Sequence, residues 1–146
     1  MIDDLRPPAT DADWTAYHAI RRRVLFELRG NGAAYDPNHP DERAANHHPL
    51  LLWTDHGPVG VIRVDVHDAV AIFRRVAVRD DVQRRGHGRR LLQAAERFAQ
   101  AQGCTRADSH VDSAAIGFYE RCGFARVDAP PVRGTVLMSK QLVSEA

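Results

Sequence analysis

The chain has 146 residues, of which 44% are hydrophobic, which is enough for one compact domain but too few for two independently folded ones. Twenty Lys and Arg residues oppose nineteen Asp and Glu residues, so the formal net charge is +1 and any anion binding must be local. No apolar run approaches the roughly 20 residues of a membrane-spanning helix, and the N-terminus lacks an export-signal pattern. We therefore expect a single soluble domain over residues 1–146, with two free cysteines in a reducing cytoplasm.

The predicted elements begin with a short strand near residues 2–6 and a helix over Ala12–Arg29. Thr10 or Asp11 can cap this helix, whose apolar residues recur at helical spacing. The stretch 31–49 mixes prolines and glycines with polar residues and predicts a long irregular loop. Loops of this length inside a compact domain are often functional.

Three strands are predicted next, at 50–54, 59–66 and 70–78. The two connections between them are tight, which favours an antiparallel meander. An amphipathic helix follows, with an apolar stripe from Leu91 to Ala99. The remaining predicted elements are a strand at 105–111, a short helix at 114–122, and strands at 124–128 and 135–142. The order β-α-β-β-β-α-β-α-β-β predicts an α/β fold with a mixed, mostly antiparallel sheet flanked by helices.

The most informative segment is Gln83-Arg84-Arg85-Gly86-His87-Gly88, between the 70–78 strand and the amphipathic helix. A helix N-terminus presents unpaired N–H groups and a partial positive charge, so a pyrophosphate there gains hydrogen bonds and favourable electrostatics. Gly86 and Gly88 allow close backbone approach, and the arginines add charge. The segment predicts an anion-binding loop.

Three other interpretations of this loop are open to comparison. A nucleoside-triphosphate loop fails because no Gly-Lys-Ser/Thr follows the glycines, and a dinucleotide fingerprint fails because Leu91 stands where its third glycine belongs. A solvated turn that happens to hold two glycines and several arginines remains an alternative from the loop alone.

The loop resembles the central motif of the GNAT acetyltransferase superfamily, Gln/Arg-x-x-Gly-x-Gly/Ala between a strand and a long helix, with Gln83, Gly86 and Gly88 in register. The resemblance implies a GNAT-type fold and acetyl-CoA as co-substrate, with the pantetheine arm along the backbone of the 70–78 strand. The cofactor-binding residues that it implies are Val76, Ala77, Val78, Gln83, Arg84, Arg85, Gly86, His87, Gly88 and Arg89.

A second match lies at 112–124, which resembles the family's Asn-x-x-Ala-x-x-Phe/Leu-Tyr-Glu-x-x-Gly-Phe ending. It implies that Tyr119 is the general acid that protonates the departing CoA thiolate. Asp112 stands where asparagine or glutamine is usual, so a carboxylate replaces a neutral amide and a role as base becomes conceivable. The alternative for Tyr119 is an aromatic packed beside Phe118. Cys122 is interpreted as a small buried residue, since nothing in the sequence activates its thiol as a nucleophile.

Direct transfer to an amine of a small molecule or peptide requires the amine to be neutral, and alkyl amines have a pKa near ~10. The sequence offers His110, Asp112, Glu27 and the loop carboxylates as base candidates. His110 lies near the end of its predicted strand and titrates in a suitable range, while a histidine bonded within the sheet is the alternative.

The predicted 31–49 loop holds further polar residues, each of which has both a functional and a simpler interpretation. His39, His47 and His48 lack a regular ligand spacing, so we expect no metal site. Asp36, Asp41 and Glu42 form an acidic cluster that could attract a cationic amine or be merely solvated. The Arg21–Phe26 stretch, His48 and the Arg-Val-Ala-Val strand give a narrower likeness to the ElaA-like subgroup.

Two other functions compete with acetyl transfer. A non-catalytic acyl-CoA-binding sensor or interaction module needs the glycine loop but not Tyr119. A nucleic-acid binder is disfavoured by the balanced charge and the lack of an aromatic-interleaved basic stretch. The family resemblance favours a homodimer.

Overall fold

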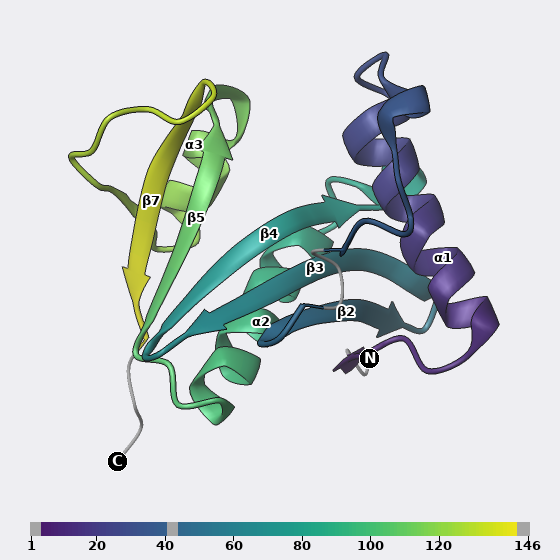
Figure 1. Cartoon of the computed structure of the whole chain (residues 1–146), viewed down its shortest axis with the longest axis horizontal. Coiled ribbons are helices and arrows are strands. Elements are labelled where there is room, and N and C mark those ends of the chain that lie inside the picture. The colour runs from purple at the N-terminus through teal and green to yellow at the C-terminus, as the bar shows by residue number, and fades with distance from the viewer. Residues whose placement is uncertain (1–3, 41–43, 143–146) are drawn as a thin grey trace.

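The computed structural model describes residues 4–40 and 44–142. One sheet of seven strands has the order β1-β2-β3-β4-β5-β7-β6 (Figure 1). The strands are β1 (Asp4–Arg6), β2 (His47–Thr54), β3 (Gly57–His67), β4 (Val70–Val78), β5 (Arg106–Asp112), β6 (Ala125–Arg126) and β7 (Thr135–Gln141). The α-helices are α1 (Asp11–Arg21), α2 (His87–Ala101) and α3 (Ile116–Arg121). The predicted α/β order and the mixed, mostly antiparallel sheet are confirmed, with β4 and β5 as the parallel pair.

The first helix begins at a capping box. Thr10 Oγ1 accepts the Asp13 backbone N–H at 3.1 Å, and Asp13 Oδ2 accepts the Thr10 N–H at 3.3 Å, so Thr10 rather than Asp11 is the cap. The helix does not continue as one α-helix to Arg29. It widens into a π-helix at Arg22–Glu27, and such insertions are frequent beside functional sites.

The first long strand is also longer than predicted, because β2 begins at His47 inside the expected loop. Its pairing with β3 starts at His47↔Asp65, whereas β1 joins it only from Leu51 onward. The segment around Pro49 is therefore an edge, where a residue without a backbone N–H is tolerated.

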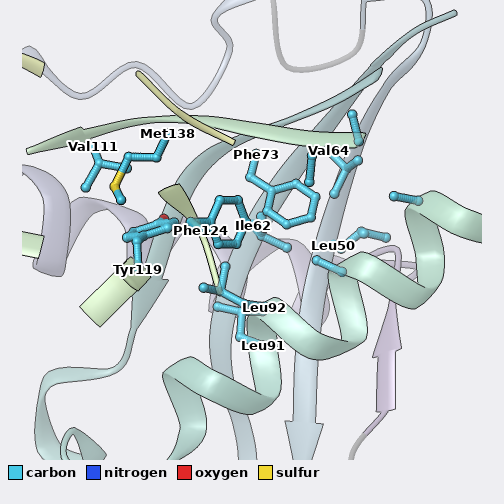
Figure 2. Packing of buried hydrophobic residues seen from close by; sticks show 14 of the residues in the cluster. Leu50, Ile62, Val64, Phe73, Leu91, Leu92, Val111, Tyr119, Phe124 and Met138 are labelled. Carbon is cyan, nitrogen blue, oxygen red and sulfur yellow. The ribbon is translucent and has the colours of Figure 1, made fainter. Parts of the chain in front are cut away.

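Helices cover both faces of the sheet. In Figure 1, α1 crosses the front of β3 and β4, while α2 lies behind them. The larger apolar cluster lies on the α2 side and includes Leu91 and Leu92, both fully buried (Figure 2). Burial of each such side chain stabilises the fold by about 1.5–3 kcal/mol. Tyr17 and Ile20 of α1 form a smaller cluster with Leu51 and Val61 on the other face.

The sheet opens between its two central parallel strands. β4 and β5 pair from Val70↔Arg106 to Phe73↔Ser109, after which β4 continues beside β3 and β5 continues beside β7. Figure 1 shows the two strand pairs diverging. The register between β3 and β4 shifts at Arg75, whose φ is +57°, and a bulge of this kind bends its strand. The bulge therefore lies at the start of the divergent part of β4.

The last strand does not extend the sheet at its edge. β7 is inserted between β5 and the two-residue β6, and it pairs with β5 from Thr135↔Asp112 to Gln141↔Arg106. Within residues 4–40 and 44–142, no helix is both long and apolar enough to cross a membrane.

Candidate active site

A cleft of about 1620 Å³ occupies the opening between β4 and β5. Its walls come from the second half of β4, the end of β5, the first turn of α2, α3 and the segment that follows α1. Pockets for drug-sized ligands measure roughly 300–1,000 Å³. The cleft is therefore large enough for an extended ligand together with a second molecule.

The glycine loop forms the N-terminus of α2. Gly86 is the N-cap with φ +83°, a left-handed conformation that suits glycine, and Arg84 also has positive φ at +66°. The Arg90 N–H bonds to the Gly86 carbonyl oxygen at 3.1 Å, so the preceding N–H groups belong to the open first turn of the helix. Gln83 Nε2 donates to the Val78 carbonyl oxygen at 2.9 Å and joins the loop to the end of β4.

The second glycine of the loop, which also lines the cleft, packs against the second sequence motif. Gly88 lies against the ring of Phe118, and a Cβ added at Gly88 would lie 3.0 Å from Phe118 Cζ. Close packing between α2 and α3 therefore requires glycine here. The contact joins the two sequence motifs directly.

Tyr119 lies where β4 and β5 part. Ser109 Oγ donates to the Phe73 carbonyl oxygen at 3.3 Å and lies 3.5 Å from Tyr119 Oη, and Phe73↔Ser109 is the last pair of the parallel register. The ring is 6% exposed and packs beside Phe124 (Figure 2). Burial raises the pKa of Tyr119 above its ordinary value of 10.0, more than the Ser109 hydrogen bond lowers it. The phenol therefore keeps its proton at neutral pH.

The cleft brings together most of the residues expected from the two motifs. The lining residues among them are Val76, Ala77, Val78, Gln83, Arg84, Gly86, Gly88, Arg89, His110, Asp112 and Tyr119. Two others lie apart from the lining. Arg85 is exposed, and the His87 side chain is buried with its Nδ1 3.3 Å from Arg90 Nη1. His87 can contribute its backbone N–H but not its ring.

The base candidates differ in their positions. His110 is exposed on β5 and lines the cleft, on the same face as Asp112. Asp112 Oδ2 is 3.1 Å from Arg29 Nη2, an ion pair that joins the end of β5 to the segment after α1. Glu27 does not line the cleft, and it lies 3.9 Å from Arg23.

The structure adds a buried charged cluster that sequence reasoning missed. Asp65 is 2% exposed and accepts two hydrogen bonds from Arg63 at 2.8 and 2.9 Å and one from Arg74 Nε at 3.0 Å. His47 Nε2 lies 3.4 Å from the same carboxylate. All four residues line the cleft. The alternation of charged and apolar residues over 61–66 was the available signal, since it puts Arg63 and Asp65 on one face of a strand.

The histidines of the loop region do not converge. His47 lies on Asp65, whereas the ring of His48 packs against Phe98 of α2, on the other face of the sheet. The described residues contain no group of three or more His, Cys, Asp or Glu side chains that could hold a metal ion. Of the acidic cluster, Asp36 accepts a hydrogen bond from the Asn38 N–H, while Asp41 and Glu42 lie outside the described residues.

The thiol of Cys122 is not activated. Its pKa is raised, mainly by burial, so the thiolate that a nucleophile requires is disfavoured at neutral pH. The Cys122 carbonyl oxygen accepts a 2.8 Å hydrogen bond from Lys140 Nζ, which fixes the end of α3 against β7. This supports the interpretation of Cys122 as a packing residue.

Comparisons with known proteins agree with this geometry. Residues 45–126 match the model of the acetyltransferase (GNAT) domain family. A crystal structure named "putative N-acetyltransferase" from Lactobacillus plantarum is 30% identical, with 98% of this chain and 100% of that chain covered and a TM-score of 0.81. The PaiA N-acetyltransferase of Thermoplasma acidophilum, crystallised with coenzyme A, is 16% identical with a TM-score of 0.73 (97% and 99% covered). Escherichia coli ElaA is 14% identical with a TM-score of 0.78 (95% and 98% covered) and shares the fold.

The chain belongs to the GNAT acetyltransferase family. It is therefore an acyl-CoA-dependent acyltransferase, and acetyl-CoA is the co-substrate of this family. The residues present fit that molecule. The first turn of α2 offers N–H groups and a positive helix end to a pyrophosphate, and Arg84 and Arg89 line the cleft beside it. When bound, acetyl-CoA supplies an acetyl group activated as a thioester.

Proposed function

We propose that this protein transfers the acetyl group of acetyl-CoA directly to the amine of a small molecule or peptide, with Tyr119 as the general acid. The position of the Tyr119 hydroxyl carries the proposal. It lies beside Ser109 and the Phe73 carbonyl, where β4 and β5 separate and the cleft begins. A protonated phenol at this point can pass its proton to the departing sulfur as the C–S bond breaks.

The proton of the incoming amine needs an acceptor, and the cleft lining offers His110 and Asp112. We assign this role first to His110, because its side chain is exposed and lines the cleft, and histidine is the side chain that most often acts as a general base. Asp112 is already paired with Arg29, so it serves at least to hold the segment after α1 against β5.

Binding of acetyl-CoA is tested by calorimetry on a matched pair of glycine variants. Gly86 and Gly103 have φ of +83° and +90°, and an added Cβ at either meets at most the end of a flexible arginine side chain at 3.9 Å. Gly86→Val and Gly103→Val therefore carry a similar backbone strain, but only Gly86 lies at the cleft. We expect acetyl-CoA affinity to fall at least tenfold in Gly86→Val only. Equal losses, or no binding to the wild type, would contradict the assigned site.

The acid role is tested by kinetics of Tyr119→Phe with any acetylated amine. Loss of a general acid lowers kcat by about 10²–10⁴-fold, while the KM for acetyl-CoA should stay within about twofold because the ring remains. Tyr17→Phe is the control, since it removes a buried phenol that bonds to Arg21 on α1, outside the cleft lining. If both variants keep kcat within about threefold of the wild type, Tyr119 is only a packing residue.

Three further expectations belong to the same proposal. Residues 1–146 form a single N-acetyltransferase domain, and the protein acts in the cytoplasm, where the free thiols of Cys104 and Cys122 stay reduced. The homodimer that the family resemblance favours is checked by sedimentation at micromolar concentration.

A further inference from the structure

The cleft lining outside α2, the loop before it and α3 is cationic. The described residues of this part include five arginines and two carboxylates, Asp65 and Asp112, which leaves an excess of three positive charges (five minus two). Both carboxylates are already in ion pairs, Asp112 with Arg29 and Asp65 with Arg63 and Arg74. The five arginines are Arg29, Arg63, Arg74, Arg75 and Arg133. An acceptor that is purely cationic is poorly matched to these walls.

Among these arginines, Arg74 is held in a fixed orientation and still reaches the cleft. Its Nε donates to Asp65 at 3.0 Å, and Asp65 is itself fixed by the two hydrogen bonds from the buried Arg63. The Arg74 side chain nevertheless remains 41% exposed and lines the cleft. A guanidinium anchored through Nε presents its terminal nitrogens as a planar fork, which matches the two oxygens of a carboxylate or phosphate.

Arg74 is also close to the point of acetyl transfer. It directly follows Phe73, whose carbonyl oxygen accepts the Ser109 hydroxyl beside Tyr119. Phe73 belongs to the core on the α2 side, and successive side chains of a strand point to opposite faces, so Arg74 is on the opposite face. An anion bound there lies beside β4, one residue along the strand from the carbonyl oxygen that holds Ser109. This position favours a small acceptor, in which the anionic group and the amine are close together.

We propose that the acceptor is a small amine carrying an oxyanion group, a carboxylate or a phosphate, which Arg74 binds with the support of Asp65 and Arg63. This rests on the acetyltransferase function proposed above and specifies its substrate class. The same positive charges disfavour the protonated amine, because a nearby like charge lowers the pKa of an ammonium group. The cationic wall thus assists deprotonation of the acceptor as well as its binding.

The test is an acetylation screen with matched probes. The standard amino acids and 2-aminoethyl phosphate are the anionic set, and the amino-acid amides and n-alkylamines of similar length are the set without an anion. We expect kcat/KM for the best anionic acceptor to exceed that of its uncharged-tail counterpart at least tenfold. Arg74→Gln should raise the KM for that acceptor about 10–100-fold with the KM for acetyl-CoA unchanged, and Arg74→Lys should recover part of the loss.

Arg97→Gln removes the same charge from an exposed position of α2 outside the cleft lining and should leave both KM values unchanged. Asp65 keeps Arg63 as partner in the Arg74 variants, and their circular dichroism and melting temperature check that they fold. The substrate class is refuted if acetyl-CoA binds but the uncharged-tail amines are acetylated equally well or better, or if no anionic acceptor is acetylated. Failure of acetyl-CoA to bind refutes the acetyltransferase function itself.

Discussion

The contact between Gly88 and Phe118 gives a sharp prediction, because it reverses the usual effect of replacing a helical glycine. Gly88 is in the first turn of α2 and has an ordinary helical φ. At an unconstrained helix position, Gly→Ala would stabilise the protein by up to about 1 kcal/mol. Here the new Cβ would lie 3.0 Å from Phe118 Cζ and 3.4 Å from Cε1. The closest approach is about 0.5–1 Å shorter than an ordinary carbon–carbon contact.

We expect Gly88→Ala to be destabilising. Overpacking of this size costs about 1–3 kcal/mol, and subtracting the helix gain leaves a net loss of about 1 kcal/mol. For a protein of this length, that corresponds to a fall in Tm of about 2–4 °C. Because Phe118 precedes Tyr119 in α3, a displaced ring should also lower kcat.

The test is a double-mutant cycle with Phe118→Leu, in which urea unfolding gives the free energy of unfolding of each variant. Leucine lacks the Cζ and Cε1 atoms that meet the new methyl group, so Gly88→Ala should be neutral or stabilising in that background. The expected coupling energy is about 1–2 kcal/mol. Equal effects of Gly88→Ala in both backgrounds, or a higher Tm in the single variant, would refute the packing explanation.

Three further predictions concern ionisation and capping. The pKa of Tyr119 is higher in the folded state than in the unfolded state, so the unfolded chain binds fewer protons between these two pKa values. The free energy of unfolding should therefore fall with pH above about 10. A Tm that falls as steeply with pH in Tyr119→Phe would contradict this. Asp65→Asn leaves the buried Arg63 without a counter-ion and should lower the free energy of unfolding, measured with a chemical denaturant, by about 3–5 kcal/mol. Much of this loss should be recovered when Arg63→Met is combined with Asp65→Leu. An unchanged stability of Asp65→Asn would show that the cluster is not structural. Thr10→Ala removes the α1 cap and should lower the free energy of unfolding by about 1 kcal/mol, whereas Asp11→Ala should have little effect.

The order of the elements and the location of the two motifs could be predicted from the sequence alone. The strand at Val70–Val78 was predicted with the bounds that the structure has, because short connections and apolar alternation are local signals. The Gln83–Gly88 loop before an amphipathic helix was equally local, as was the capping of α1. The predictions from sequence were wrong where contacts with neighbours in space override local preference. Examples are the π-helix after Arg21 and the start of β2 at His47.

Which residues share the cleft could not be predicted in this way, because it depends on contacts between segments distant in the sequence. β4 separates from β5 because β4 continues beside β3 and β5 continues beside β7. β7 follows β5 only after α3 and β6, yet it lies beside β5 in the sheet. The same long-range arrangement pairs Arg29 with Asp112, sets Gly88 on Phe118 and brings Arg74 to Asp65. These contacts join residues from separate strands and helices, and sequence periodicity describes one element at a time. Which charged side chains face one another across the cleft is therefore fixed by strand order and register, which only the folded chain reveals.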